Sequence, residues 1–384
     1  SNKNPAFFVA WYTKVKQTLP NEMSVFISSN RKSLLAISVK NSLKIIELEK
    51  NEAILSYVNQ LTSVKEEQNE VDIIAHKFSP DSCYFAAITG NKKLFVWKMA
   101  DKNVCCTMDI GKRPTCLSFE HDKNTVVVGD KSGDVYQCAL EETKPKLLLG
   151  HLSMVLDVIL TPDCSFIISA DRDEKIRVSS YPMSFCIHSF CLGHTGMVSC
   201  ISLISTDRLV SVSSDLTLRL WDFKKGIQLS ESVQLPKDCI VSHLEVCSNE
   251  IAIMAERLTE LRIYRVDNDL IRFHSVIKLH STLLSFTYVA ENNIAVVLKD
   301  SSRPFVMLRL VEDVYTEVNH ELCLAISSHI GMDFSLLPEP STLIQLLKPV
   351  NGKRSFQAIT PEATINIESS SISNYSKKTK TAVK

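Results

Sequence analysis

The stretch LVSVSSDLTLRLWD, residues 209–222, places a tight turn between two apolar strand-like runs and lies shortly after Gly193-His194. A buried carboxylate in such a turn must be satisfied by hydrogen-bond donors such as imidazole and hydroxyl groups. The residues that we expect to form this group are His194, Ser211, Asp215 and Trp221. Their counterparts one repeat earlier are predicted to be His151, Ser169 and Asp173. We interpret both groups as structural rather than catalytic, because they support a turn of the fold.

The same pattern recurs along the chain at a nearly constant spacing. The two Gly-His pairs, at 150 and 193, are 43 residues apart, and the turn position recurs every 41 to 43 residues. The successive turn residues are Asn91, Ser132, Asp173, Asp215 and Leu258, with weaker copies at Lys40 and within 294–310. Seven copies at this period are typical of a WD-repeat β-propeller, in which each repeat forms one four-stranded blade.

The sequence therefore predicts an all-β fold, a seven-bladed WD-repeat β-propeller. We expect the propeller domain to cover 1–350, with blade-like repeats at about 34–310 and closing segments at both ends. Residues 62–72 read as a loop insertion, and residues 322–350 are expected to pack on or complete the last blade. The tail at 351–384 is predicted to be largely disordered, because from residue 366 it is rich in Ser, Thr and Lys. Its lysines (Lys377, Lys378, Lys380 and Lys384) are typical of a nuclear import signal, so we expect the protein in the nucleus and also in the cytoplasm.

Composition and motifs argue against several classes of protein. The 43 basic and 43 acidic side chains cancel, which excludes a polycation built to coat nucleic acid. No apolar run approaches the roughly 18 residues that span a bilayer. The 12 cysteines include no C-x-x-C pair, so neither a metal site nor a disulfide framework is predicted. No G-x-G-x-x-G, P-loop, H-E-x-x-H or G-x-S-x-G motif occurs, and we predict no catalytic residue and no bound cofactor. Carboxylates or histidines meeting in the central channel would be the enzymatic alternative.

One blade turn carries an unusual concentration of charge, in the sequence ADRDEK at 170–175. With Asp173 pointing inward, Arg172 would project from a rigid hairpin. Lys131 aligns with Arg172 one blade earlier, and the blade before that offers Lys92 and Lys93. The candidate partner-binding residues are accordingly Arg172, Asp171, Lys175, Lys131, Lys92 and Lys93. The alternative is that Arg172 only pairs with Asp171 or Glu174 at the surface, an interaction worth about 0–1 kcal/mol.

Three segments of this region also resemble a known family. They read LLLGHLSMVLDVILTPDCSFIISADRDEKIRVS at 147–179, SFCLGHTGMVS at 189–199 and GDKSGDVY at 129–136. All three resemble the non-catalytic WD-repeat subunit of the tRNA (guanine-N7-)-methyltransferase, closely over about 126–222 and loosely over 34–310. Ser179 departs from the pattern, because the family usually has a strand-end Trp there.

The resemblance implies a scaffold that binds and stabilises a separate catalytic subunit in a heterodimer. That partner would carry S-adenosylmethionine and form N7-methylguanosine in tRNA, while this chain would bind tRNA weakly or indirectly. The resemblance also implies that Arg172 faces a carboxylate of the partner, to which its planar fork could donate two hydrogen bonds. The roles of Lys131, Lys92 and Lys93 extend this expectation by blade alignment alone.

An alternative function comes from Trp221-Asp222-Phe223-Lys224. It matches the W-D-x-R/K box by which some propellers serve as substrate receptors of a cullin-type ubiquitin ligase. The box is short and overlaps an ordinary repeat, so the partner could be a ligase adaptor in place of, or in addition to, a methyltransferase.

Overall fold

The computed structural model describes residues 25–48, 52–57, 72–121, 124–237, 241–255, 258–300 and 302–317, together with 323, 326 and 327. Residues 52–57 are described by their backbone only. All of these residues belong to the first of two compact units, Ser1–Leu346. The second unit, Leu347–Lys384, lies outside the described residues, and so do the predicted disorder and basic lysines of the tail. Nearly all of the loop insertion predicted at 62–72 also lies outside them.

Seven antiparallel sheets form the blades of a propeller, which confirms the predicted fold class. Blade 1 contains β1 (Val25–Ser29), β2 (Leu34–Val39), β3 (Ser42–Glu47) and β4 (Glu52–Tyr57), and blade 2 contains β5 (Ile73–Phe78), β6 (Tyr84–Thr89), β7 (Lys93–Lys98) and β8 (Asn103–Asp109). Blade 3 contains β9 (Pro114–Phe119), β10 (Thr125–Asp130), β11 (Asp134–Ala139) and β12 (Lys146–Gly150), and blade 4 contains β13 (Val155–Leu160), β14 (Phe166–Asp171), β15 (Ile176–Ser180) and β16 (Ile187–Cys191).

The last three blades follow the same order along the chain. Blade 5 contains β17 (Val198–Leu203), β18 (Arg208–Ser213), β19 (Thr217–Asp222), β20 (Ile227–Gln228) and a short extra strand, β21 (Val233–Gln234). Blade 6 contains β22 (Val241–Cys247), β23 (Glu250–Ala255), β24 (Glu260–Asp267) and β25 (Leu270–Lys278). Blade 7 contains β26 (Leu283–Ala290), β27 (Asn293–Leu298), β28 (Phe305–Val311) and β29 (Val314–Glu317). Every blade is built from consecutive strands, so no described strand is exchanged between blades.

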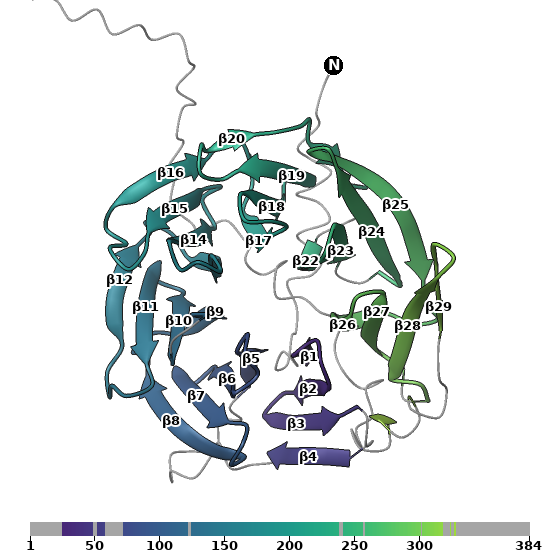
Figure 1. Cartoon of the computed structure of the whole chain (residues 1–384), viewed down its shortest axis with the longest axis horizontal. Helices are drawn as coiled ribbons and strands as arrows, with labels where there is room; N and C mark the ends of the chain where they lie inside the picture. Colours follow the sequence, from purple (N-terminus) through teal and green to yellow (C-terminus); the bar gives the residue numbers. More distant parts are fainter. Residues whose placement is uncertain are drawn as a thin grey trace, which may run out of the picture. The chain divides into compact units, whose positions relative to one another are not determined.

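The position of a strand within its blade determines how apolar it is. The first strand of each blade lies nearest the centre of the ring and the fourth lies on the rim (Figure 1). The second strands, such as β14 with its sequence FIISAD, are almost entirely buried because neighbouring blades cover both of their faces. The fourth strands have one neighbour only, and β16 is mostly exposed. Continuous apolar runs in the sequence therefore mark second strands.

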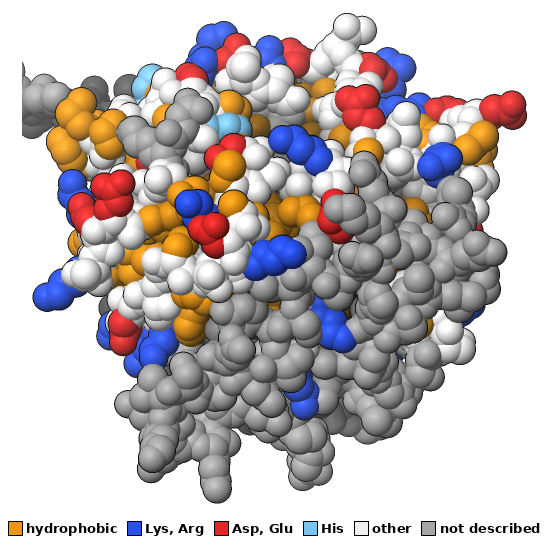
Figure 2. Space-filling view, turned by 60° about the horizontal axis from the view of Figure 1, so that its bottom comes forward, with side chains coloured by type: hydrophobic (Ala, Val, Ile, Leu, Met, Phe, Trp, Pro, Cys, Tyr) orange, Lys and Arg blue, Asp and Glu red, His pale blue; other side chains and the backbone are white. Residues whose placement is uncertain are grey.

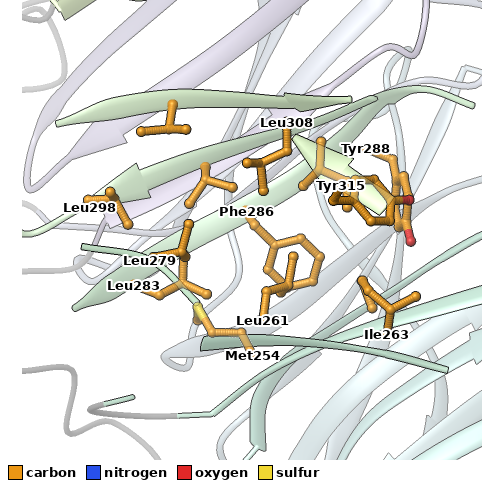
Figure 3. Close-up of a cluster of buried hydrophobic side chains, with 14 of the residues drawn as sticks. Met254, Leu261, Ile263, Leu279, Leu283, Phe286, Tyr288, Leu298, Leu308 and Tyr315 are labelled. Carbon is orange, nitrogen blue, oxygen red and sulfur yellow. The ribbon is translucent and has the colours of Figure 1, made fainter. Parts of the chain in front are cut away.

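Apolar side chains fill the space between neighbouring blades. Figure 3 shows the cluster between blades 6 and 7, in which Met254 and Leu261 of blade 6 face Phe286 and Leu308 of blade 7. At one end of this cluster the hydroxyl of Tyr315 donates a hydrogen bond to Glu250 Oε2 at 2.6 Å. Similar clusters lie between the other blades, so each blade depends on its neighbours to bury its faces.

The ring closes between blade 7 and blade 1. Their first strands, β26 and β1, lie side by side, and the backbone N–H of Ile27 donates to Ser285 Oγ at 3.2 Å. The apolar cluster at this seam includes Ile326, which is fully buried, and Cys323 packs against it. Cys323 and Ile326 belong to the segment 322–350, which was predicted to pack on or complete the last blade. They lie in the seam between the last blade and the first.

His76 holds blades 1 and 2 together in its neutral form. The ring is buried, its Nε2 lies 3.2 Å from the carbonyl oxygen of Phe26 and its Nδ1 lies 2.8 Å from the hydroxyl of Ser28. Nε2–H therefore donates and Nδ1 accepts. Burial is the largest influence on the ring and lowers the pKa of His76 to about 4.

Acid should weaken the fold through His76. Between about pH 6.5 and 4 the unfolded chain binds a proton at His76 that the folded chain excludes, so stability is full above pH 6.5 and falls as the pH drops. Urea unfolding of the wild type should show a loss of about 2 kcal/mol from this residue between pH 7 and 5. His76→Gln should remove that part of the pH dependence. Equal losses in both proteins would contradict this assignment.

Candidate partner interface

The hydrogen-bonded group of blade 5 joins the loop before β17 to strands β18 and β19. Trp221 Nε1 donates to Ser211 Oγ at 2.8 Å, and the Ser211 hydroxyl lies 2.7 Å from His194 Nε2. His194 Nδ1 lies 2.9 Å from Asp215 Oδ2. Because the Asp215 carboxylate can only accept, His194 Nδ1–H donates to it, and the Ser211 hydroxyl connects Trp221 Nε1–H to His194 Nε2. The four predicted residues thus form one continuous chain of bonds.

Asp215 remains ionised in this group although it is largely buried. Burial raises its pKa, but hydrogen bonds from His194, from the Thr217 hydroxyl and from the backbone of Thr195 outweigh that effect. The net result is a pKa well below the usual range of an aspartate. The group therefore serves to fix two loops on the propeller, with all of its proton donors already engaged.

Blade 4 uses a different aspartate from the one that the sequence predicts. His151 Nδ1 lies 3.0 Å from Asp171 Oδ2, and His151 Nε2 lies 2.7 Å from the Ser169 hydroxyl. Asp171 is only 1% exposed, so assigning it to partner binding was wrong. Asp173, predicted to belong to the structural group, is exposed in the turn.

The reason for this correction lies in the strand end. Asp171 is the last residue of β14, and its Oδ1 also accepts the backbone N–H of Lys175 at 3.0 Å, which closes the hairpin. In blade 3 the last residue of β10, Asp130, closes its own hairpin through the N–H groups of Ser132 and Asp134. Blade 5 has Ser213 at the strand end and uses Asp215, two residues later. The turns align, but the carboxylate occupies different positions in them.

A repeated backbone bond fixes the hairpin that carries Arg172. The N–H of Arg172 donates to the carbonyl of Met154 at 2.9 Å, and the N–H of Lys131 donates to that of Arg113 at 3.0 Å. Gly90 in blade 2 and Ser214 in blade 5 make the same bond, to Asp72 and Met197. Arg172 and Lys131 therefore occupy equivalent places, as their spacing predicts, in turns anchored to the preceding loop.

Lys92 and Lys93 occupy a different place from Arg172. Gly90 holds the Arg172 position in blade 2, while Lys92 has a φ of 69° and matches Gly133 of blade 3, with a φ of 104°. Lys93 begins β7 and is half-buried. Lys92 still projects into solvent on the same side of the ring, because every blade turns between its second and third strands there.

The surface around the Arg172 hairpin combines charge with exposed apolar side chains. Arg172 is half-buried, whereas Lys131 and Lys175 are exposed. Of the two alternative partners of Arg172, Asp171 already accepts from His151 and from the Lys175 N–H, and Glu174 is exposed in the turn. Leu152 is 101% exposed and directly follows His151, which Asp171 holds in place. Leu152 was not among the predicted site residues, although an apolar residue in a loop next to a charged turn indicates a binding surface.

The residues of the W-D-x-R/K box take ordinary structural positions. Trp221 and Phe223 are buried, and the carboxylate of Asp222 contacts Lys225 Nζ at 3.1 Å. Lys224 Nζ lies 2.5 Å from Asp207 Oδ1. Nothing in this geometry sets the box apart from a repeat end. Within the described ranges, no group of three or more His, Cys, Asp or Glu side chains could hold a metal ion, and no helix is long and apolar enough to cross a membrane.

Comparison with known proteins identifies one family. The sequence model of the tRNA methyltransferase TRM82 WD40 domain matches residues 28–146 and 140–307. The tRNA (guanine-N(7)-)-methyltransferase non-catalytic subunit wuho of Drosophila grimshawi is 41% identical over 180 residues, 46% of this chain and 46% of the relative. The non-catalytic subunit WDR4 of Homo sapiens is 44% identical over 167 residues, 42% of this chain and 40% of the relative. The matched part thus spans less than half the length of these curated relatives.

Solved structures agree on the fold alone. A chain of the mitotic checkpoint complex has a TM-score of 0.63 and 15% identity, covering 75% of this chain and 87% of that one. The structure of U3-55K has a TM-score of 0.60 and 16% identity, covering 73% and 90%.

Replacing each aspartate of the charged turn by alanine should show which of the two stabilises the hairpin. Asp171→Ala removes the acceptor of His151 and of the Lys175 N–H, which should cost about 1–3 kcal/mol of stability. Asp173→Ala alters an exposed side chain and should change stability by less than about 0.5 kcal/mol. Chemical denaturation of the two variants measures the difference. A larger loss of stability for Asp173→Ala than for Asp171→Ala would mean that Asp173 belongs to the structural group, as the sequence predicted.

Proposed function

Because the chain belongs to the tRNA methyltransferase TRM82 WD40 domain family, we propose that it is a non-catalytic subunit that binds and stabilises the catalytic subunit of a tRNA guanine-N7 methyltransferase. The printed names of its relatives support this role. The structural observation that carries it is the Arg172 hairpin, a turn that holds the half-buried Arg172 and is bonded to the loop that carries the fully exposed Leu152.

Rigidity is what makes this hairpin suitable for binding. Both ends of the turn are fixed, by the Arg172–Met154 backbone bond and by the bonds from Asp171 to His151 and Lys175. A preorganised turn loses little conformational entropy when a partner binds. A carboxylate on the catalytic subunit could accept two charge-assisted hydrogen bonds from the planar guanidinium.

The division of labour between the subunits follows from charge and chemistry. We place S-adenosylmethionine on the catalytic subunit because this sequence contains no G-x-G-x-x-G motif. We place the specificity for tRNA there because this chain has no net charge and its surface mixes both signs, as the coloured part of Figure 2 shows. Weak, salt-sensitive tRNA contact from Lys131 and Lys92 is compatible with this role. Tight retention of tRNA on a filter by this chain alone at physiological salt would contradict it. Nuclear localisation through the lysines at 377–384 stays a prediction.

Reversing the charge at Arg172 should break the complex without unfolding the propeller. Arg172→Glu would oppose two negative charges in a largely desolvated contact and should cost about 2–5 kcal/mol of binding. Lys278→Glu, an exposed charge reversal at the end of β25 in blade 6, is the matched control. Gel filtration of each variant with the catalytic subunit measures complex formation.

The wild type and Lys278→Glu should co-elute with the catalytic subunit, and Arg172→Glu should elute separately. An intact complex with Arg172→Glu would remove this residue from the interface. Capture of a ligase adaptor in place of the methyltransferase by the wild type would favour the alternative function.

A further inference from the structure

Exposed apolar side chains are unevenly distributed over the described ring. More than half of the large hydrophobic residues that are exposed lie within residues 147–192, in blades 3 and 4 and the loops next to them. Those that follow the outer edge form what we name the blade 4 rim: Leu147, Met183, Phe185, Ile187, Phe190 and Leu192. Phe185 is 74% exposed and Leu192 is 61% exposed. Clustered exposure of this kind marks an interaction surface rather than scattered surface residues.

The loop that carries Met183 and Phe185 is held rigidly on blade 3. The hydroxyl of Tyr181 donates to the buried Glu120 Oε2 at 2.8 Å, and the Ser184 hydroxyl donates to the carbonyl of Leu148 at 2.7 Å. Arg177 Nη2 donates to the Ser184 carbonyl at 2.9 Å. These bonds place the loop next to β12, whose Leu147 is 56% exposed. The chain thus uses buried polar bonds to keep two apolar side chains in solvent.

The blade 4 rim runs up to the Arg172 hairpin. Strand β16, which carries Ile187 and Phe190, is the outermost strand of blade 4 and follows β12 along the periphery of the ring (Figure 1). Because Cys191 pairs with Ile176, the next residue, Leu192, lies beside Lys175 at the end of the same hairpin. The apolar rim therefore begins beside the charged turn at Leu192 and extends along β16 to the loop at the other end of that strand, which carries Met183 and Phe185.

We propose that the blade 4 rim is the apolar half of the docking surface whose charged half is the Arg172 hairpin, and that its occupant is the catalytic subunit. This inference rests on the proposed function and extends it to the shape of the partner. The partner must present an apolar patch next to a carboxylate, so that the patch covers β16 while the carboxylate meets Arg172. Interfaces gain most of their affinity from a few buried anchors, chiefly aromatic side chains and arginines, and the rim and Arg172 would supply both kinds.

The rim can be tested by a paired substitution with a control on the opposite rim. The double variant Phe185→Ser/Ile187→Ser should bind the catalytic subunit with an affinity at least tenfold lower than the wild type in calorimetric titration. Phe273→Ser, at a 55% exposed phenylalanine on the outer strand β25, should leave the affinity unchanged. All three altered residues are substantially exposed, and thermal melting of each variant checks that the fold is kept.

A second measurement uses the wild-type chain, so it does not depend on whether a substituted protein folds. Cys186 lies exposed between Phe185 and Ile187, while Cys83 is exposed in blade 2. Binding of the catalytic subunit should slow thiol modification of Cys186 at least tenfold and leave Cys83 unchanged.

The outcomes separate the two proposals. Failure of the wild type to bind the catalytic subunit would overturn the proposed function itself. Wild-type binding that Arg172→Glu weakens but the rim pair leaves intact, with Cys186 still reactive, would overturn only the rim. Protection of Cys186 that rises with the concentration of this chain alone would assign the rim to a second copy and also overturn it.

Discussion

The contact between the first strands of neighbouring blades is the constraint on which the rest of the structure depends. A single blade leaves both of its faces apolar, so it is stable only when neighbours cover them. Side chains around the channel bond across successive first strands: Thr115 to the Val155 carbonyl at 2.6 Å, the Ile201 N–H to Asp157 at 2.9 Å, and the Tyr288 N–H to Glu245 at 2.9 Å. Without an exchanged strand in the described ring, closure relies on the apolar seam between blades 7 and 1.

A closed ring converts flexible loops into fixed surfaces. In blades 2 to 5 and in blade 7, the hairpin between the second and third strands is bonded to the loop that precedes the blade, so a side chain such as Arg172 is displayed at a defined place. In blade 4 the groups that hold the turn are bonded to one another, since His151 contacts both Asp171 and Ser169. A fold arranged in this way suits a protein that positions another subunit. Chemistry would then belong to the partner, whose binding depends on rigidity more than on net charge.

Features set by local spacing could be predicted from the sequence. The 41- to 43-residue period placed the blades, identified the group around Asp215, and made Arg172 and Lys131 equivalent. Features that depend on which side-chain atoms come into contact could not be predicted from the sequence. Asp171 and Asp173 differ by two positions in one turn, and only the distance to His151 shows that the first is buried. The exposure of Phe185 was also beyond the sequence, because it results from distant bonds such as Tyr181 to Glu120.

We propose that this ring supports catalysis by another subunit and performs none itself. One experiment compares the N7-methylguanosine formed in tRNA from S-adenosylmethionine by the catalytic subunit alone, by this chain alone, and by the two mixed. We expect no product from this chain alone and at least a tenfold higher rate from the mixture than from the catalytic subunit alone. Methylation by this chain alone, or equal rates with and without it, would rule out this role.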